Sequence, residues 1–296
     1  MVRLDSPSLF PEQSFTHLYI LGNGFDIAHK LRTKYSDFRS WMRLHHEGDA
    51  FMLMDYLDVD KKDLLWSNFE EALGMMDIEK IKNTNLGNLY LVFTSDSKYI
   101  GSRLADADIF SRLGCYFSEW AKDNNKDLKR ILPIYPFEDR SLYINFNYTD
   151  TLEVVYGIPE ARISHINGRA SKEEKVVIGH NRMIDPVSVY SGNPNLVRAE
   201  NDYLQNIMNY EDLVKDGYAQ VEKLPSYFRK SLSEVKYVNV IGHSYGTVDN
   251  TYFKTIRNLL SDDVTWLLHY HSEEDLTRLK SFIKAMKFKS PVISKI

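Results

Sequence analysis

The sequence contains very little cysteine, with Cys115 alone among 296 residues. A single cysteine excludes a disulfide within the chain and a zinc site made of several cysteines, so a reducing compartment is the expected location. The chain also lacks any apolar run near the roughly 20 residues that span a bilayer. Its first residues lack the apolar stretch of a secretion signal. We therefore expect a soluble, cytoplasmic protein that does not associate with membranes.

The chain also lacks an excess of positive charge. Its formal net charge is −4 at pH 7, which argues against strong nucleic-acid binding. Aromatic residues, in contrast, are plentiful, with 19 Tyr, 15 Phe and 4 Trp. Together with the length of the chain, they are enough to build the sizeable core of a globular protein.

Short apolar runs alternate with helical patterns along the chain, which predicts a parallel sheet. We expect strands at 17–22, 141–147, 161–166, 174–180, 236–243 and 264–271. Because each run is continuously apolar, helices should cover both faces of the sheet, as in a Rossmann-like α/β fold. About 30–135 is helical in pattern and forms an insertion after the first strand–helix unit. We expect a single domain over 1–296, with 1–15 as an N-terminal tail.

Polar side chains recur where these strands are expected to end. The carboxyl ends of parallel strands share one edge of the sheet, and ligands bind at that edge in open α/β folds. The polar residues at this edge are Asn23, Asn147, His165, Asn167, His180, Asn181, His243, Ser244, His269 and His271. No two of these histidines have the i, i+4 spacing of a helical metal motif. We therefore expect a ligand site without a metal.

The segment Gly242-His243-Ser244-Tyr245-Gly246 fits the G-x-S-x-G pattern of a serine-hydrolase nucleophile elbow. In that interpretation Ser244 is a nucleophile, and an acid and a histidine follow it on later strands. Too little chain follows for those strands, Tyr245 is bulky for an elbow, and no loop of His-Gly-Gly-Gly type offers an oxyanion hole. A serine hydrolase is the weaker alternative.

Gly22-Asn23-Gly24 separates the first strand from a helix, as a phosphate loop does. Two glycines allow a tight turn and a close approach of pyrophosphate to the helix N-terminus. Ile27 stands where a third glycine is expected, and no second strand with an acidic residue follows at the usual spacing. By itself this loop indicates a dinucleotide site only weakly.

Seven segments, taken in order, resemble the bacteriophage abortive-infection AbiH family over about 17–275. They are LYILGNGFDIAHKLRTKYSDF, WSNFEEAL, INFNYTDTLE, HING, VVIGHN, VIGHSYGTVDNTYF and WLLHYHSEED. The Asn-Gly-Phe-Asp box after the first strand is the most specific of them. More distantly, the same order is similar to the sirtuin-like NAD-binding fold, which has a glycine loop, an asparagine box, a His-Gly strand end and a late Gly-x-Ser box.

The resemblance implies an anti-phage abortive-infection effector that binds NAD or a related nucleotide. It implies nucleotide contacts from Gly22, Asn23, Gly24, Phe25, Asp26, His180, Gly242, His243 and Ser244. For cleavage of the bond between nicotinamide and ribose, it implies Asn147, His165 and Asn167 as the catalytic residues. Two alternatives stay open at this point: an NAD(P) glycohydrolase, and a non-catalytic module that senses the nucleotide.

The sequence departs from the sirtuin-like pattern at two positions. Asn167-Gly168 stands in place of His-Gly, with His165 two residues earlier. Because side chains alternate along a strand, we expect His165 and Asn167 to point the same way, so the base is either displaced to His165 or lost. Thr149 stands where aspartate is usual. The four cysteines of a zinc-dependent deacetylase are absent.

The partners of the chain are less defined by its sequence. The resemblance leaves room for a phage-derived or host protein as the trigger, and for a homo-oligomer. Trp66 and Glu70 are spaced to share one helix face, for which core packing with a capping acid is the simplest interpretation.

Overall fold

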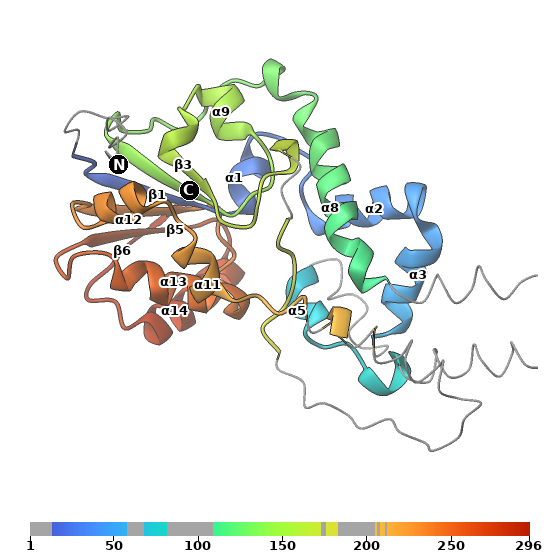
Figure 1. The fold of residues 1–296 in the computed structure, drawn as a ribbon. Helices are drawn as coiled ribbons and strands as arrows, with labels where there is room; N and C mark the ends of the chain where they lie inside the picture. The colour runs from blue at the N-terminus through green and yellow to red at the C-terminus, as the bar shows by residue number, and fades with distance from the viewer. Residues whose placement is uncertain are drawn as a thin grey trace, which may run out of the picture.

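A six-stranded parallel sheet lies in one half of the molecule, on the left in Figure 1. The computed structural model describes residues 14–57, 68–81, 109–172, 176–182, 205, 208–210 and 212–296. The strands are β1 His17–Leu21, β2 Ser141–Asn145, β3 Ile163–His165, β4 Tyr237–Ile241, β5 Thr265–Tyr270 and β6 Val292–Lys295. Their order in the sheet, β3-β2-β1-β4-β5-β6, is that of the doubly wound Rossmann arrangement. The predicted fold class is confirmed.

Helices cover both faces of the sheet because successive strand residues point to opposite sides. In β1, Leu18 and Ile20 face one core, to which α11 Gly217–Glu222, α12 Ser226–Leu232, α13 Asn250–Asn258 and α14 Glu273–Met286 contribute. Tyr19 and Leu21 face the other, with α1 Asn23–Ala28 and α9 Thr151–Tyr156. The continuously apolar run in β1 is therefore explained by burial on both sides.

Between β1 and β2 the described residues beyond α1 form helices and loops that pack beside the sheet (Figure 1). These helices include α2 Tyr35–His45, α3 Glu47–Asp55, α5 Phe69–Leu73, α8 Phe110–Asn125 and the short 3-10 helix η3 Leu128–Arg130. Their apolar faces share a core of their own, in which Phe38 lies 4.0 Å from Phe117 between ring centroids. These helices therefore form a second layer of hydrophobic packing rather than an extension of the sheet core.

The strand predicted at 174–180 is wrong. The part of it that the structure describes, 176–180, forms only an isolated bridge between His180 and Val214. Val176 and Ile178 are buried in the core of the helices α2 to α8. The apolar run thus reflects burial against the insertion. The sixth strand of the sheet is instead β6, which is largely exposed at the edge and therefore lacks a clear apolar pattern.

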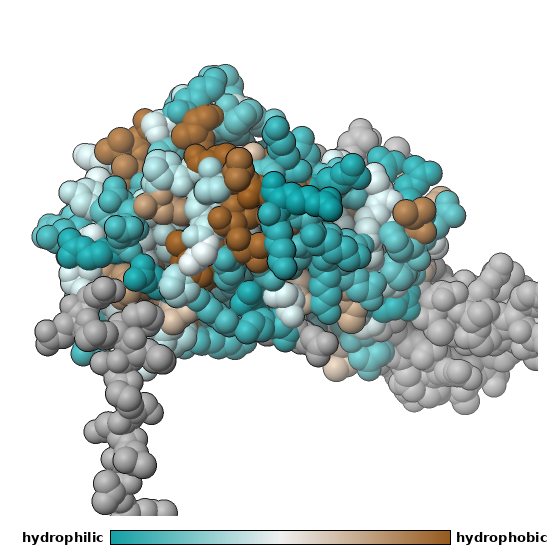
Figure 2. All heavy atoms as spheres, turned by 90° about the horizontal axis from the view of Figure 1, so that it is seen from above, coloured by the Kyte–Doolittle hydropathy of each residue, from teal (hydrophilic) through white to brown (hydrophobic). Residues whose placement is uncertain are grey.

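The surface seen from above is mainly hydrophilic, with hydrophobic patches toward the middle of that face (Figure 2). Large exposed hydrophobic residues of the molecule include Leu132, Ile134 and Val154. Among the described helices, none combines the length and the apolar character needed to cross a membrane.

The loops after β1 and β4 touch backbone to backbone. Gly22 N donates to Ile241 O at 2.9 Å, and Gly24 N donates to Gly242 O at 2.7 Å. A Cβ on Gly24 would lie 2.7 Å from Gly242 Cα, and a Cβ on Gly242 would lie 2.1 Å from Phe25 N. Gly242 also has φ +67°, a region that disfavours other residues. The space that the sequence pattern reserves for pyrophosphate is therefore filled by the chain itself.

We predict that Gly242→Ala destabilises the protein by more than about 2 kcal/mol, because the new methyl group collides with the backbone and the positive φ is strained. Gly48→Ala is the matched control, since a Cβ there meets nothing within 4 Å. In helix α3 it should leave the protein unchanged or stabilise it by up to about 1 kcal/mol. Urea unfolding measures both, and equal effects of the two substitutions would contradict the packing argument.

Candidate functional site

A pocket of about 940 Å³ opens at the carboxyl edge of the sheet, next to the contact between the β1 and β4 loops. Strand order reverses between these two strands, which is where ligands bind in doubly wound sheets. From the sheet side it is lined by Gly22, Asn23, Gly24, Asp26, Asn147, Asn167, Gly242, His243, Ser244, Asp249, His269 and His271. From the helices that follow β1 it is lined by Thr33, Lys34, Tyr35, Ser36, Glu70, Phe117 and Trp120. The pocket therefore joins both layers.

Two asparagines are held rigidly in its wall. Asn147 donates its side-chain N–H to Gly22 O at 3.1 Å, while Asn167 donates to Phe146 O at 3.1 Å. The side-chain oxygen of Asn167 accepts from the Tyr252 hydroxyl at 3.4 Å. The side-chain oxygen of Asn147 has no partner among the described residues, so it is free to accept a hydrogen bond from a ligand.

Asp26 joins α1 to the loop after β2. Its carboxylate accepts hydrogen bonds from Thr149 Oγ1 at 2.5 Å and from Thr151 Oγ1 at 2.8 Å. Burial raises the pKa of Asp26 to about 6, although both hydroxyls act to lower it. A threonine at position 149 is therefore explained, because its hydroxyl donates to Asp26 where an aspartate would repel it.

His243 and Asp249 form a buried pair. His243 Nδ1 accepts a hydrogen bond from the Tyr245 backbone N–H at 2.9 Å. The proton of the neutral ring must then be on Nε2, which lies 3.1 Å from Asp249 Oδ2 and donates to it. Both nitrogens of His243 are thus engaged, and the ring fixes the orientation of the Asp249 carboxylate.

A second carboxylate approaches Asp249 from the opposite layer. Glu70 in α5 lies 2.6 Å from the ammonium of Lys215, and Asp249 Oδ1 lies 3.6 Å from the same ammonium. The Lys215 side chain is 1% exposed. At 3.6 Å the contact with Asp249 is an ion pair without a hydrogen bond, and Asp249 Oδ1 is a buried oxygen with no hydrogen-bond donor.

The two carboxylates have different acidities. Burial raises the pKa of Glu70 despite the attraction of Lys215. Burial also acts to raise the pKa of Asp249, but Lys215 and His243 together outweigh burial and lower this pKa to about 2. Two carboxylates facing one pocket with pKa values moved apart can take different roles in one reaction.

The sequence pointed to neither Lys215 nor Asp249, and it offered only a structural role for Glu70. Lys215 belongs to no motif, so no local signal could reveal it. Asp249 lies in the same segment as the Gly-x-Ser box. Its closeness to His243 in the sequence was the one signal that could have identified it. Trp66, which the sequence pairs with Glu70, lies outside the described residues.

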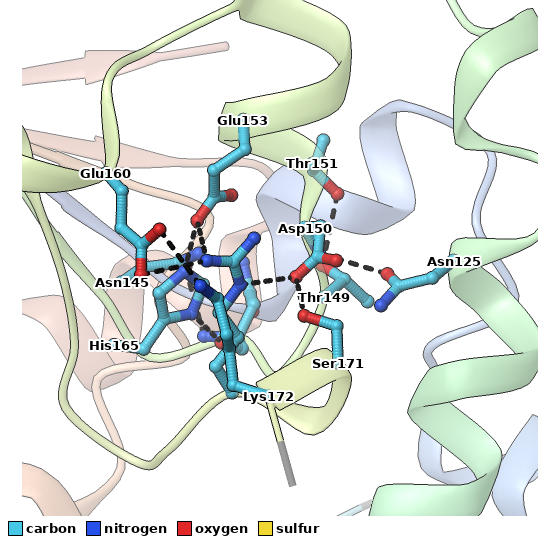
Figure 3. A network of polar contacts seen from close by, with 12 residues as sticks. Asn125, Asn145, Thr149, Asp150, Thr151, Glu153, Glu160, His165, Ser171 and Lys172 are labelled. Atoms are coloured by element: carbon cyan, nitrogen blue, oxygen red, sulfur yellow. Dashed lines mark hydrogen bonds and ion pairs between the residues drawn. The ribbon is translucent and has the colours of Figure 1, made fainter. Parts of the chain in front are cut away.

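His165 does not reach the pocket. Strand β3 ends at His165, so the alternation expected to bring it beside Asn167 does not continue. His165 Nε2 lies 2.8 Å from Glu153 Oε1 (Figure 3). Its Nδ1 lies 3.2 Å from Asn147 O. Glu153 and Asp150 both pair with Arg169 in the same network. His165 therefore links β3 to α9, and the expectation that it shares a face with Asn167 is wrong.

Phe25 and His180 also lie outside the lining of the pocket. Phe25 is fully buried and packs 4.6 Å from His29 between ring centroids. His180 is fully buried, with Nε2 at 3.2 Å from Tyr210 O, and burial lowers its pKa to about 4. Both side chains are explained by core packing, which corrects the nucleotide contacts that the family resemblance implies for them.

Ser244 lines the pocket and is exposed. Within the described parts of the chain no histidine forms a hydrogen bond with its hydroxyl, because His243 turns to Tyr245 N and Asp249 instead. In a nucleophile elbow the serine sits on the strained turn, whereas here the residue with a positive φ, of 55°, is Tyr245. Ser244 therefore lacks the base of a nucleophile elbow.

A family model described as "Bacteriophage abortive infection AbiH" matches residues 18–270. The chain belongs to the AbiH family. This match spans β1 to β5 and the helices between them, and it associates the protein with bacteriophage abortive infection. Comparisons with curated proteins and with solved structures gave no match. In this AbiH protein the family segments around Gly22, Asn147 and Gly242 therefore meet in one pocket.

We predict that Asp26→Asn becomes progressively more stable than the wild type as the pH rises from about 4 to 6. The folded state holds the Asp26 proton more tightly than the unfolded chain does, so protonation of Asp26 stabilises the fold. This stabilisation is complete below the pKa of the unfolded chain and is lost as the pH rises to the folded-state pKa of about 6. The amide stays neutral throughout. The difference in unfolding free energy should grow by up to about 3 kcal/mol.

Urea unfolding at several pH values measures this difference. Asp262→Asn is the matched control, because Asp262 is exposed and should show no such trend. A pH-independent difference for Asp26→Asn would show that the buried carboxylate is not the titrating group.

Proposed function

We propose that this AbiH protein is an abortive-infection effector that binds NAD or a related nucleotide in the pocket and hydrolyses its bond between nicotinamide and ribose. The observation that carries the proposal is the pair of carboxylates, Glu70 and Asp249, which face one pocket with pKa values moved in opposite directions. The similarity of the motif order to sirtuin-like NAD-binding domains favours NAD among the nucleotides.

Cleavage of this bond does not require an acid to protonate the leaving group. When the bond between ribose C1′ and the nicotinamide nitrogen breaks, its electron pair moves to the positively charged ring, and nicotinamide leaves as a neutral molecule. The ribose carbon that remains has oxocarbenium character, and glycoside-cleaving enzymes stabilise such a centre with a carboxylate. Asp249 suits this role because its low pKa keeps it ionised.

Water completes the reaction by bonding to C1′ and giving up a proton. Glu70 suits the role of proton acceptor, since a carboxylate with a raised pKa is a stronger base than an ordinary one. Asn147 Oδ1 accepts a hydrogen bond from a ribose hydroxyl or from the water. His243 and Lys215 hold Asp249 and do not contact the substrate.

A non-catalytic sensor is the second candidate. It is favoured by one observation: His243 lines the pocket, yet both of its nitrogens are engaged, and His165 lies outside. With these two imidazoles occupied, proton transfer falls to the carboxylates or to His269 and His271, which also line the pocket. In the sensor, NAD binds and stabilises the fold without turnover.

We predict that Glu70→Gln and Asp249→Asn each lower nicotinamide release from NAD at least about 100-fold, the range for loss of an acid–base or charge-stabilising group. Release is followed by chromatography with purified protein, with and without extract of phage-infected cells as a source of the trigger. Asp262→Asn is the matched control for a carboxylate changed to an amide.

Thermal unfolding with and without ADP-ribose accompanies the assay, because Asp249→Asn removes one partner of a buried charge and loses stability. Stabilisation by ADP-ribose in a variant without turnover separates loss of chemistry from loss of fold. Wild-type protein that is stabilised by NAD but releases no nicotinamide under either condition would leave the sensor as the function.

A further inference from the structure

The backbone donors that bind phosphate in other doubly wound folds are engaged within this chain. After β1, the Gly24 N–H donates to Gly242 O at 2.7 Å. At the start of α2, the Lys34 N–H donates to the Asp37 carboxylate at 3.1 Å. Both donors are therefore taken before a pyrophosphate could reach them.

Carboxylates predominate among the charged side chains of the pocket. The four that line it are Asp26, Glu70, Asp249 and Asp275. Among the lining residues that the structure describes, Lys34 is the only lysine or arginine. Lys215 is 1% exposed, and its charge is already paired with two of the carboxylates. The excess of negative charge repels a phosphate group and attracts a cation.

Two aromatic side chains line the pocket close to its buried carboxylates. Tyr35 and Tyr148 are both partly buried. Burial raises the pKa of each phenol, and the charges of Glu70 and Asp249 act in the same direction, so both tyrosines lie near these carboxylates. An aromatic face attracts a flat cation through its quadrupole, and the neighbouring carboxylates add to that attraction.

Two polar atoms of the pocket wall await a partner. Asn147 is 5% exposed, and its side-chain oxygen accepts no hydrogen bond from the described residues. The Tyr35 hydroxyl likewise has no hydrogen-bond partner in the described structure. A ribose hydroxyl can donate to Asn147 Oδ1, and a carboxamide oxygen can accept from the Tyr35 hydroxyl. A ligand with both groups would satisfy both atoms.

We propose that this pocket recognises a pyridinium nucleoside and provides no phosphate site. The pyridinium ring lies against Tyr35 and Tyr148, beside the carboxylates, and the phosphates of NAD extend out of the pocket. Nucleosides such as nicotinamide riboside are then ligands as good as NAD. The inference rests on the proposed nicotinamide site but not on hydrolysis.

Calorimetric titration with three related probes tests this ligand class. The first is the carbocyclic analogue of nicotinamide riboside, in which a methylene group replaces the ring oxygen of the ribose, so that the bond to nicotinamide stays intact. The second is its neutral 1,4-dihydro form, and the third is its 5′-phosphate. The cation should bind roughly tenfold tighter than the neutral form. The 5′-phosphate should bind no tighter than the unphosphorylated cation.

Substitutions at Tyr35 separate the aromatic face from the hydroxyl. Tyr35→Phe should weaken both nucleosides by a similar factor and keep the preference for the cation, because the ring remains. Tyr35→Leu should reduce that preference several-fold, because leucine has no quadrupole. Tyr218→Leu is the matched control, since Tyr218 is 62% exposed and does not line the pocket. Thermal unfolding of the ligand-free variants confirms that each is folded.

The outcomes distinguish the ligand class from the proposed reaction. A preference for the cation in a protein that releases no nicotinamide supports the pyridinium site and rejects the hydrolase. Equal binding of the cation and the neutral form, or a 5′-phosphate that binds more than about tenfold tighter, would overturn the inference even in a protein that hydrolyses NAD. An unchanged preference in folded Tyr35→Leu protein would overturn the role given to Tyr35.

Discussion

The buried ammonium of Lys215 is the interaction on which the arrangement of the site depends. An ammonium that is 1% exposed is costly to bury unless carboxylates surround it. Glu70 comes from α5 and Asp249 from η6 Thr247–Asp249, just before α13, so the pairing requires these two elements to meet. The same charge lowers the pKa of Asp249. One buried cation therefore positions the insertion against the sheet and sets the electrostatics of the pocket.

The sheet could be predicted well from local patterns because its central strands are buried on both faces. Such strands are mostly apolar, and β1 and β2 follow that pattern, whereas β4 begins with an exposed Tyr237 and contains Asn239. The same signal failed at 174–180, because burial against a helical core leaves the same run of apolar residues as burial in a sheet. It also failed at β6, an exposed edge strand whose pairing partner is known only once the fold is formed.

The site was predictable only where its residues directly follow strands. Asn147 and Ser244 were placed correctly at the pocket, because parallel strands bring their carboxyl ends together. His165 failed because strand alternation ends with β3. Lys215 carries no local signal, since its role comes from contacts with segments distant in the sequence. Residues whose importance lies in long-range pairing are invisible to a local pattern.

The glycines after β1 and β4 show how one pattern serves two purposes. In dinucleotide-binding folds the missing side chains admit pyrophosphate, whereas here they admit the neighbouring loop. In the proposed complex the ribose contacts Asn147 and Asp249 on the sheet side, while Glu70 faces it from the helical layer. A ligand held from both layers binds most tightly when they are docked, so by linkage it stabilises that docking. In that proposed complex, ligand binding is therefore coupled to the contact between Glu70 and Asp249 that Lys215 mediates.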